Sequence, residues 1–309
     1  MSSGAGASAG GAASVAGAGG TSAGAGGATS GGASGSAGSS GGGSAGSAGS
    51  AGAANSMIPD TKVVMYLPNW SGSFSSWASK IDFNKMTHLL LAFGVVNSGT
   101  NDWNLGASDA DVQTLAKAAH AANVKILVSI GGADDDIGII TRYQTESNIA
   151  PLVANLDSFV SRLDLDGVDV DLERGADMKS SGNYPEFISK LVAQFRPEGK
   201  LVTSALAQYI VEDMGSDATV TQSLNAFDFI NLMIYSTNMN DYTSELNWWT
   251  TNKGIAKNKL TWGVEFSNSL TVNMAKQLTT ASKAYGGVMV WEYSQGTEPT
   301  LWPAIQASL

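Results

Sequence analysis

The chain has 309 residues and a formal net charge of −10, with 17 Lys and Arg against 27 Asp and Glu. It contains no cysteine, which excludes disulfides, thiolate metal sites and a cysteine nucleophile. An acidic chain without a basic stripe is a poor candidate for binding nucleic acid or an anionic membrane, and no apolar run approaches the ~18 residues of a membrane span. The two histidines, His88 and His120, lie in a predicted strand and a predicted helix, and we interpret both as structural.

The amino-terminal segment differs in composition from the rest of the chain. Apart from Met1 and Val15, residues 1–54 are only Gly, Ala, Ser and Thr. Such a segment has too little apolar surface to offset its chain entropy, so we expect residues 1–55 to form a flexible tail or linker. No signal peptide is visible at its start. Residues 56–309 have a globular composition and the length of one α/β barrel domain.

Beyond the tail, apolar and β-branched runs predict strands, which in chain order span 62–68, 87–94, 124–132, 165–173, 201–207, 227–235, 260–267 and 286–293. Helical patterns fill most of the gaps, over 108–123, 148–163, 184–197 and 272–287. Apolar strands that alternate with helices indicate parallel pairing, and eight such units predict a closed (β/α)8 or TIM barrel. An open doubly wound sheet is the competing fold, but the turn after the first strand, with Pro68 and Trp70, lacks a glycine-rich phosphate loop.

The fourth predicted strand contains the sequence DGVDVDLE, residues 166–173. Because side chains alternate along a strand, Asp169, Asp171 and Glu173 share one face, while the valines and leucine between them share the other. In a barrel the acidic face points inward, and Glu173 reaches the carboxyl-terminal rim where barrel active sites form. Carboxylates so close cannot all ionise, so at least one pKa is expected to be raised, which suits a general acid.

A solvated edge and a metal site both fit this acidic strand less well than a catalytic face does. A solvated acidic edge would not be interleaved with residues that require burial. A divalent-metal site in a barrel usually gathers acids from several strands, whereas these come from one, so we predict neither a metal nor a cofactor. Another acidic run, residues 134–136, follows the third predicted strand, and we interpret it as a solvated loop with a role at a helix N-terminus.

The sequence DGVDVDLE matches the Asp-Gly-x-Asp-x-Asp-x-Glu signature of glycoside hydrolase family 18, the chitinase family. Four further segments resemble the family in order and spacing, namely THLLLAF, LVSIGG, NLMIYS and GGVMVWEY. The resemblance extends from about Lys62 to Tyr293. It implies hydrolysis of β-1,4 bonds in N-acetylglucosamine polymers such as chitin or chito-oligosaccharides. It also implies substrate-assisted retaining catalysis, in which the 2-acetamido oxygen of the sugar forms an oxazolinium ion.

The resemblance also assigns roles to matching residues. Glu173 would be the general acid and base, Asp171 would orient the acetamido group, Asp169 would pair with Asp171, and Tyr235 would hydrogen-bond the acetamido oxygen. Residues on the substrate side would be Tyr66, Phe93, Ser129, Met233, Ser236 and Trp291, with Trp291 as the floor under the sugar and with Tyr66 and Ser129 also supporting Asp169. Structural support would come from Asp166, Gly131 and Gly132.

Two features separate the chain from the usual family pattern. Family members usually have Asp after the tyrosine of the sixth strand, where this chain has Ser236, and Asn238 is a candidate for compensating the change. Only residues 268–285 separate the last two predicted strands, so the small α+β insertion of many processive members is missing. The expected groove is therefore open, which favours endo-acting cleavage.

Other functions stay open beside chitin hydrolysis. One is an endo-β-N-acetylglucosaminidase-like enzyme acting on N-glycans or peptidoglycan-like material. Another is a non-catalytic, lectin-like chitin-binding module, although such relatives usually lose the glutamate that Glu173 supplies. We expect a monomer that is extracellular or tethered to a cell surface. Four tryptophans lie near predicted strand ends, where packing and sugar binding are equally compatible roles: Trp70, Trp77, Trp248 and Trp249. Glu265 and Glu292 also lie near strand ends, and we leave both unassigned.

Overall fold

The computed structural model describes residues 61–97, 99–134, 136–266, 270–293 and 298–309. The predicted tail, residues 1–55, lies outside the described residues. The chain divides into two units, Met1–Ser50 and Ala51–Leu309, and the described residues all belong to the second.

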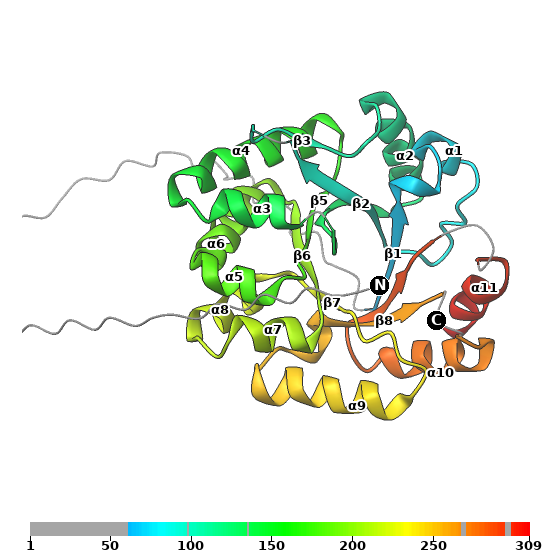
Figure 1. The fold of residues 1–309 in the computed structure, drawn as a ribbon. Coiled ribbons are helices and arrows are strands. Elements are labelled where there is room, and N and C mark those ends of the chain that lie inside the picture. Colours follow the sequence, from blue (N-terminus) through cyan, green and yellow to red (C-terminus); the bar gives the residue numbers. More distant parts are fainter. Residues whose placement is uncertain (1–60, 98, 135, 267–269, 294–297) are drawn as a thin grey trace, which may run out of the picture. The chain divides into compact units, whose positions relative to one another are not determined.

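Parallel strands form a closed barrel with helices around it, as Figure 1 shows, and the predicted (β/α)8 fold is confirmed. The barrel strands are β1 (Lys62–Pro68), β2 (His88–Val96), β4 (Lys125–Gly131), β5 (Gly167–Asp171), β6 (Leu201–Leu206), β7 (Ile230–Leu232), β8 (Leu260–Glu265) and β9 (Gly287–Trp291). β1 closes the barrel by pairing in parallel with both β2 and β9. A short strand, β3 (Trp103–Asn104), pairs antiparallel with the end of β2.

Helices follow the strands along the chain. The predicted helices correspond to α2 (Asp109–Ala121), α4 (Glu146–Arg162), α6 (Tyr184–Phe195) and α10 (Val272–Ser282). Ser108 caps α2 as its sequence predicts, by accepting a hydrogen bond from the backbone N–H of Asp111. The sequence shows only weak helical patterns after the first and fifth predicted strands, where the structure has α1 (Phe74–Trp77) and α7 (Gln208–Met214) with α8 (Ala218–Ala226). The helices for which the sequence pattern predicts no bounds are α3 (Asp136–Tyr143), α5 (Gly175–Ser181), α9 (Met239–Asn247) and α11 (Glu298–Ser308).

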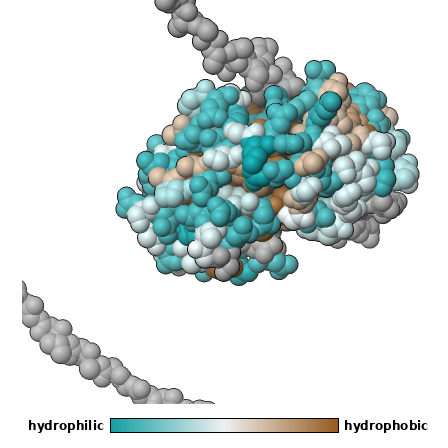
Figure 2. Space-filling model, turned by 90° about the horizontal axis from the view of Figure 1, so that it is seen from above, coloured by the Kyte–Doolittle hydropathy of each residue, from teal (hydrophilic) through white to brown (hydrophobic). Residues whose placement is uncertain are grey.

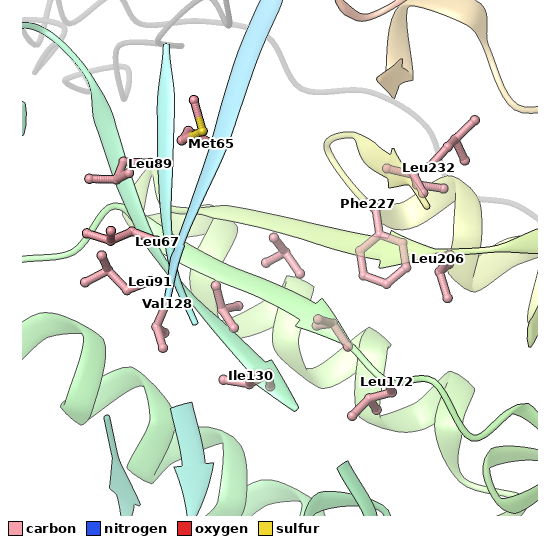
Figure 3. Close-up of a cluster of buried hydrophobic side chains, with 14 of the residues drawn as sticks. Met65, Leu67, Leu89, Leu91, Val128, Ile130, Leu172, Leu206, Phe227 and Leu232 are labelled. Carbon is pink, nitrogen blue, oxygen red and sulfur yellow. The ribbon is translucent and has the colours of Figure 1, made fainter. Parts of the chain in front are cut away.

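The barrel wall separates two apolar clusters. The larger lies between strands and helices, where Met65, Leu67, Leu89, Leu91 and Val128 are fully buried (Figure 3). Each such side chain contributes roughly 1.5–3 kcal/mol by burial, so this layer holds the helices on the barrel. The smaller cluster lies inside the barrel and includes Val64, Leu90, Leu127, Phe229 and Met289.

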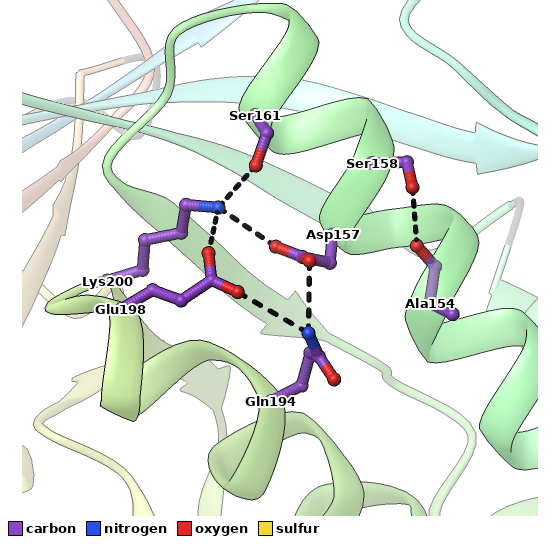
Figure 4. Close-up of polar contacts among 7 residues, drawn as sticks. All are labelled: Ala154, Asp157, Ser158, Ser161, Gln194, Glu198 and Lys200. Carbon is purple, nitrogen blue, oxygen red and sulfur yellow. Dashed lines mark hydrogen bonds and ion pairs between the residues drawn. The ribbon is translucent and has the colours of Figure 1, made fainter.

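Polar contacts join the helices near the start of β6. The Lys200 ammonium contacts Asp157 of α4 at 2.9 Å and Glu198 at 2.7 Å (Figure 4). The Gln194 side chain of α6 donates a hydrogen bond of 3.0 Å to the same Asp157. Pairs at the surface contribute about 1 kcal/mol or less each, so this network orients α4 and α6 more than it stabilises them.

The surface seen in Figure 2 is mostly hydrophilic, with hydrophobic residues in smaller areas between hydrophilic ones. Among the described residues, the large hydrophobic side chains that are exposed are those of Trp70, Ile137 and Tyr209. Among the described helices, none combines the length and the apolar character needed to cross a bilayer.

Candidate active site

β5 carries the acidic motif through the barrel as the alternation predicts. Asp169 and Asp171 are buried, and Glu173 lies two residues beyond the strand end and is half-buried. Val168 and Val170 point the other way and belong to the core between strands and helices. The apolar face of β5 therefore fixes the strand, and its acidic face supplies the site.

Asp169 lies in the centre of a cage of neutral hydrogen-bond donors. One carboxylate oxygen accepts from the hydroxyls of Tyr66 at 2.8 Å and Ser129 at 2.9 Å. The other accepts from the Thr203 hydroxyl at 2.6 Å and the Asn231 amide at 3.3 Å. Complete burial raises the pKa of Asp169, and the four hydrogen bonds oppose that rise. The predicted contacts of Tyr66 and Ser129 with Asp169 are present, whereas Thr203 and Asn231 were not predicted.

Asp171 lacks such a cage. Its Oδ1 atom is buried and has no hydrogen-bond partner among the described residues. Burial raises the pKa of Asp171 well above its ordinary value, and the negative charges of Glu173, Asp169 and Asp136 raise it further. The side chain therefore holds a proton over a wider pH range than an ordinary aspartate, and it has an unused polar atom at the bottom of a pocket.

Glu173 lies at the rim beside Asp171. Burial raises its pKa first, and the charge of Asp136 raises it next, while a hydrogen bond from the backbone of Ala133 lowers it. The net direction is upward. A glutamate at a barrel rim with a raised pKa is suited to donate a proton near neutral pH.

A pocket of about 430 Å³ opens over these carboxylates, which is within the size range of small-ligand sites. The Phe93 and Trp291 rings stack in its wall with centroids 5.6 Å apart, and the exposed Trp70 ring lies 6.3 Å from Trp291. Aromatic faces beside carboxylates form an amphipathic wall of the kind that holds a sugar ring. The pocket is lined by Trp70, Phe93, Gly131, Gly132, Ala133, Asp134, Asp171, Glu173, Met233, Tyr235, Glu265 and Trp291.

The glycine pair at the end of β4 makes room for these groups. Gly131 and Gly132 have φ angles of +109° and +85°, a region that favours glycine. A Cβ atom on Gly131 would lie 2.2 Å from the Asp171 carbonyl oxygen, and one on Gly132 would lie 2.6 Å from the Phe93 ring. Glycine at both positions therefore lets β4, β5 and the aromatic wall approach one another, in keeping with the predicted supporting role.

Ser236 is not among the residues that line the pocket. Its hydroxyl donates a hydrogen bond to Asp241 and accepts one from the backbone N–H of Asn238 at 3.0 Å. The Asn238 side chain caps α9 by accepting a hydrogen bond from the backbone N–H of Asn240. In this structure Ser236 and Asn238 therefore organise the start of α9 rather than the pocket.

Asp166 lies at the opposite end of β5, as predicted for a supporting residue. It accepts hydrogen bonds from Lys125 at 2.7 Å and from the backbone N–H of Ile126 at 2.8 Å, and it contacts the His120 ring at 2.9 Å. The other histidine, His88, is buried inside the barrel, and burial lowers its pKa to about 3. The contacts of both histidines are structural.

The interpretation of residues 134–136 as a solvated loop is wrong for Asp136. Asp136 begins α3, as a helix N-terminal role requires, but it is 0% exposed. Its carboxylate accepts hydrogen bonds from the backbone N–H groups of Glu173 and Arg174, because the first residue of α3 lies beside the residues that follow β5. Asp134 is exposed and lines the pocket, and residue 135 lies outside the described residues.

Two further residues lie near the site: Tyr209, which carried no sequence signal, and Glu265, which lies near a predicted strand end and was left unassigned. Tyr209 of α7 is 57% exposed, and the charges of Glu173 and Asp171 help to raise its pKa after partial burial, which places it in their electrostatic range. Glu265 ends β8 and lines the pocket. Within the described part of the chain, no cluster of His, Cys, Asp and Glu has the arrangement of a metal site.

Comparison with known proteins agrees with this geometry. Residues 62–280 match the model of the family described as glycosyl hydrolases family 18. The chain belongs to this family. A chitinase-like effector of Moniliophthora roreri is 30% identical over 135 residues, which cover 41% of this chain and 32% of that protein. A chitinase-like effector of Moniliophthora perniciosa is 30% identical over 108 residues, covering 32% and 25%. The chain thus spans a third or less of the curated relatives it matches.

Solved structures with the same fold cover most of this family 18 domain. A family 18 chitinase from the chitin utilization locus of Flavobacterium johnsoniae has a TM-score of 0.68 and 22% identity, covering 80% of this chain and 93% of that one. A chitinase from Bacteroides thetaiotaomicron has a TM-score of 0.66 and 18% identity, covering 80% and 96%. At these identities the likeness establishes the shared barrel fold.

Proposed function

We propose that the domain hydrolyses β-1,4 bonds between N-acetylglucosamine units in chitin or chito-oligosaccharides. The observation that supports this proposal most directly is the pairing of two carboxyl groups in the pocket lining. Glu173 has a raised pKa, and Asp171 has a buried oxygen with no hydrogen-bond partner among the described residues. One group is suited to protonate a leaving oxygen and the other to hold an amide. Family membership and the chitinases among the structural relatives favour the same substrate class.

The proposed reaction proceeds in two steps. In the first, Glu173 donates its proton to the glycosidic oxygen, that C–O bond breaks, and the sugar's acetamido oxygen bonds to the anomeric carbon. In the second, Glu173 takes a proton from water, the water oxygen bonds to the anomeric carbon, and the bond to the acetamido oxygen breaks. Two displacements on opposite faces retain the anomeric configuration, and no second carboxylate nucleophile is needed.

The neighbouring groups stabilise the positive charge that forms on the oxazolinium ring. Asp171 accepts the acetamido N–H through Oδ1, which has no partner among the described residues, and the growing positive charge of the ring favours the ionised form of its carboxyl group. The Tyr235 hydroxyl, which also lines the pocket, donates to the acetamido oxygen and orients it for attack. The Trp291 ring in the pocket wall supplies an apolar surface that excludes water, which strengthens these interactions because they act in a low dielectric.

Endo-acting cleavage is part of the proposal. The carboxylates lie in a pocket at the domain surface, with the Trp70 ring 60% exposed at its edge. The described chain between β8 and β9 contains α10, residues 272–282, as its helical element, and residues 267–269 lie outside the described residues. A polymer can then enter from the side and be cut within the chain.

The test is a product profile on the N-acetylglucosamine hexamer with the full chain, with the first anomer followed by proton NMR. The proposal expects internal cleavage and an initial β-anomer in wild type, and no turnover in Glu173→Gln. Equal rates in the two proteins, or an initial α-anomer, would overturn it. Release of glycans from a high-mannose glycoprotein but not chitin oligomers would select the endo-β-N-acetylglucosaminidase alternative, and saturable binding without turnover would select the lectin alternative.

A further inference from the structure

The buried carboxylate of Asp136 forms hydrogen bonds with the backbone of Glu173, the proposed general acid, and of the residue that follows it. One of its oxygens accepts hydrogen bonds from the backbone N–H of Glu173 at 2.9 Å and from that of Arg174 at 3.0 Å. The other accepts from the Arg174 side chain at 2.7 Å. All three bonds come from N–H donors, which is how an ionised carboxylate is satisfied when it is removed from water.

These bonds cross between two elements that are distant in sequence. Asp136 opens α3, and its own N–H donates to the Gly132 carbonyl, so its position is tied to the glycine pair under the pocket. Glu173 and Arg174 follow the last residue of β5, where the strand has ended and ladder hydrogen bonds no longer hold the chain. The carboxylate therefore replaces the missing ladder at the point where the backbone carries the general acid.

We propose that Asp136 is the positioning residue for Glu173, holding the backbone on which the general acid stands and supplying a fixed negative charge beside its side chain. This role rests on the proposed function, since Asp136 would position Glu173, the proton donor of that reaction. It is separate from substrate contact, because Asp136 is fully buried and does not line the pocket.

The electrostatic surroundings of Glu173 give the role a sign. Glu173 interacts electrostatically with titratable or charged groups from several elements around the pocket. These groups are Asp134, Asp136, Asp171, Arg174, Tyr209 and Tyr235. After burial, the charge of Asp136 is the largest cause that raises the Glu173 pKa, and the charge of Arg174 lowers it. A general acid works while it is protonated, so this charge extends activity toward higher pH.

Two substitutions should move the Glu173 pKa in opposite directions. In Asp136→Asn the amide oxygen can still accept from both backbone N–H groups, but the negative charge is lost and Arg174 is no longer neutralised. The Glu173 pKa then falls, and the alkaline limb of kcat/KM moves to lower pH. In Arg174→Gln the positive charge is lost while Asp136 keeps its own, so the pKa rises and the limb moves to higher pH.

A third substitution separates geometry from charge. Asp136→Ala removes the acceptor as well as the charge, so the backbone of Glu173 is no longer held, and kcat should fall about 100-fold, as expected for a misplacement of roughly 1 Å. The matched control is Asp177→Asn, which removes an exposed acid on neighbouring α5 that is not among the pocket-lining residues. Its pH profile and kcat should equal those of wild type.

The decisive measurement is the titration of the Glu173 carboxyl itself, by carbon-13 NMR of protein labelled at glutamate, with Glu173→Gln identifying the signal. Opposite shifts in Asp136→Asn and Arg174→Gln, with none in Asp177→Asn, support the inference. Unchanged titration in both variants overturns it, and so do equal shifts in the control. Arg174→Gln alters a side chain that is 43% exposed, so if the Asp136 variants do not fold, an unchanged Glu173 titration in Arg174→Gln still overturns the inference.

This titration needs no substrate. If wild type cleaves no glycan but Glu173 titrates as described, the proposed function fails while the coupling of Asp136 to Glu173 stands. If wild type cleaves chitin oligomers and the titration does not move, the positioning role fails alone.

Discussion

The two ends of β5 hold acidic side chains in opposite ways. At the amino-terminal end, Asp166 is matched by Lys125, His120 and a backbone N–H, so its charge is neutralised within the protein. At the carboxyl-terminal end, Asp171 is buried with an oxygen that has no partner among the described residues, and Glu173 has a raised pKa. The same chemical group therefore stabilises the fold at one end, while at the other it is left ready for a ligand.

The middle of the strand connects these two situations. Asp169 receives four hydrogen bonds from neutral groups and no cation is among these donors, so its burial cost is offset only in part and its pKa is raised. Asp171, one alternation further, receives none at Oδ1 from the described residues. The number of hydrogen bonds and ion pairs that stabilise each carboxylate thus decreases along β5 toward the pocket. This is expected of a binding or catalytic site, where buried polar groups are left to interact with a substrate.

The largest effect should come from the rim. Glu173→Gln keeps the shape of the side chain but removes the transferable proton, so kcat on a chromogenic chitobioside should fall at least ~1,000-fold, within the range for loss of a general acid. Thermal unfolding should stay within a few degrees of wild type, because the residue is only half-buried and glutamine fills the same space. A variant that keeps more than a tenth of the wild-type kcat would place the proton donor elsewhere.

Asp171→Asn should separate activity from stability at the same end. We expect kcat to fall about 100-fold, since an amide cannot supply negative charge to the oxazolinium ring. Because the folded pKa of Asp171 is raised, proton loss costs stability as pH rises above its ordinary value near 4. The variant should therefore match wild type at pH 4 and exceed it at pH 7, by about 1 kcal/mol or ~2–4 °C in Tm. Calorimetry at the two pH values checks this sign, and a loss of stability at pH 7 would contradict it.

Asp166→Ala should show the reverse at the amino-terminal end. It leaves Lys125 and the backbone N–H of Ile126 without their acceptor, so the free energy of unfolding should fall by about 2–3 kcal/mol in urea titrations. The kcat of the remaining folded protein should not change, because the residue lies at the far end of β5 from the pocket. A large loss of kcat without a loss of stability would show that the two ends are coupled.

The sequence was sufficient to predict the barrel and the acidic face of β5. Both depend on local alternation, since Val168 and Val170 must face one core while Asp169 and Asp171 face the other. The segment that contains α7 and α8 showed only a weak helical pattern, because both helices are short and packing on the barrel outweighs helical propensity in such segments.

The remaining site residues depend on contacts between distant strands. Thr203 reaches Asp169 because β6 pairs with β5 and places the two residues in register, and Asn231 comes from β7, the next strand around the barrel. Nothing local in the sequence encodes these two approaches. The local pattern predicts a solvated Asp136 because two further aspartates precede it, whereas its actual partners lie 37 and 38 residues away. Local composition could not report their closeness.

A smaller effect should appear where the pocket meets solvent. Trp70 lies beside Phe93 and Trp291 and is 60% exposed, so its ring is available to stack on a sugar unit. Trp70→Ala should raise KM for the hexamer about 5–10-fold, equivalent to roughly 1 kcal/mol, and leave KM for the dimer derivative nearly unchanged. Ile137→Ala, at another exposed hydrophobic residue, serves as the control. Equal losses of stability without a change in KM would assign Trp70 to packing.

The smallest effect should follow from the residue that departs from the family pattern. Ser236 lies one residue after Tyr235, yet its hydroxyl bonds to Asp241 and to the N–H of Asn238, at the start of α9. Ser236→Ala should therefore change kcat/KM by less than about 3-fold while lowering the free energy of unfolding by about 1 kcal/mol, the usual cost of losing such a local cap. Asp241→Asn, which weakens the same contact from the other partner, should reproduce the stability loss. If instead Ser236→Ala lowers kcat as much as Asp171→Asn does, its hydroxyl turns into the pocket when substrate binds, and the carboxyl-terminal end of the site includes a residue that the free protein holds elsewhere.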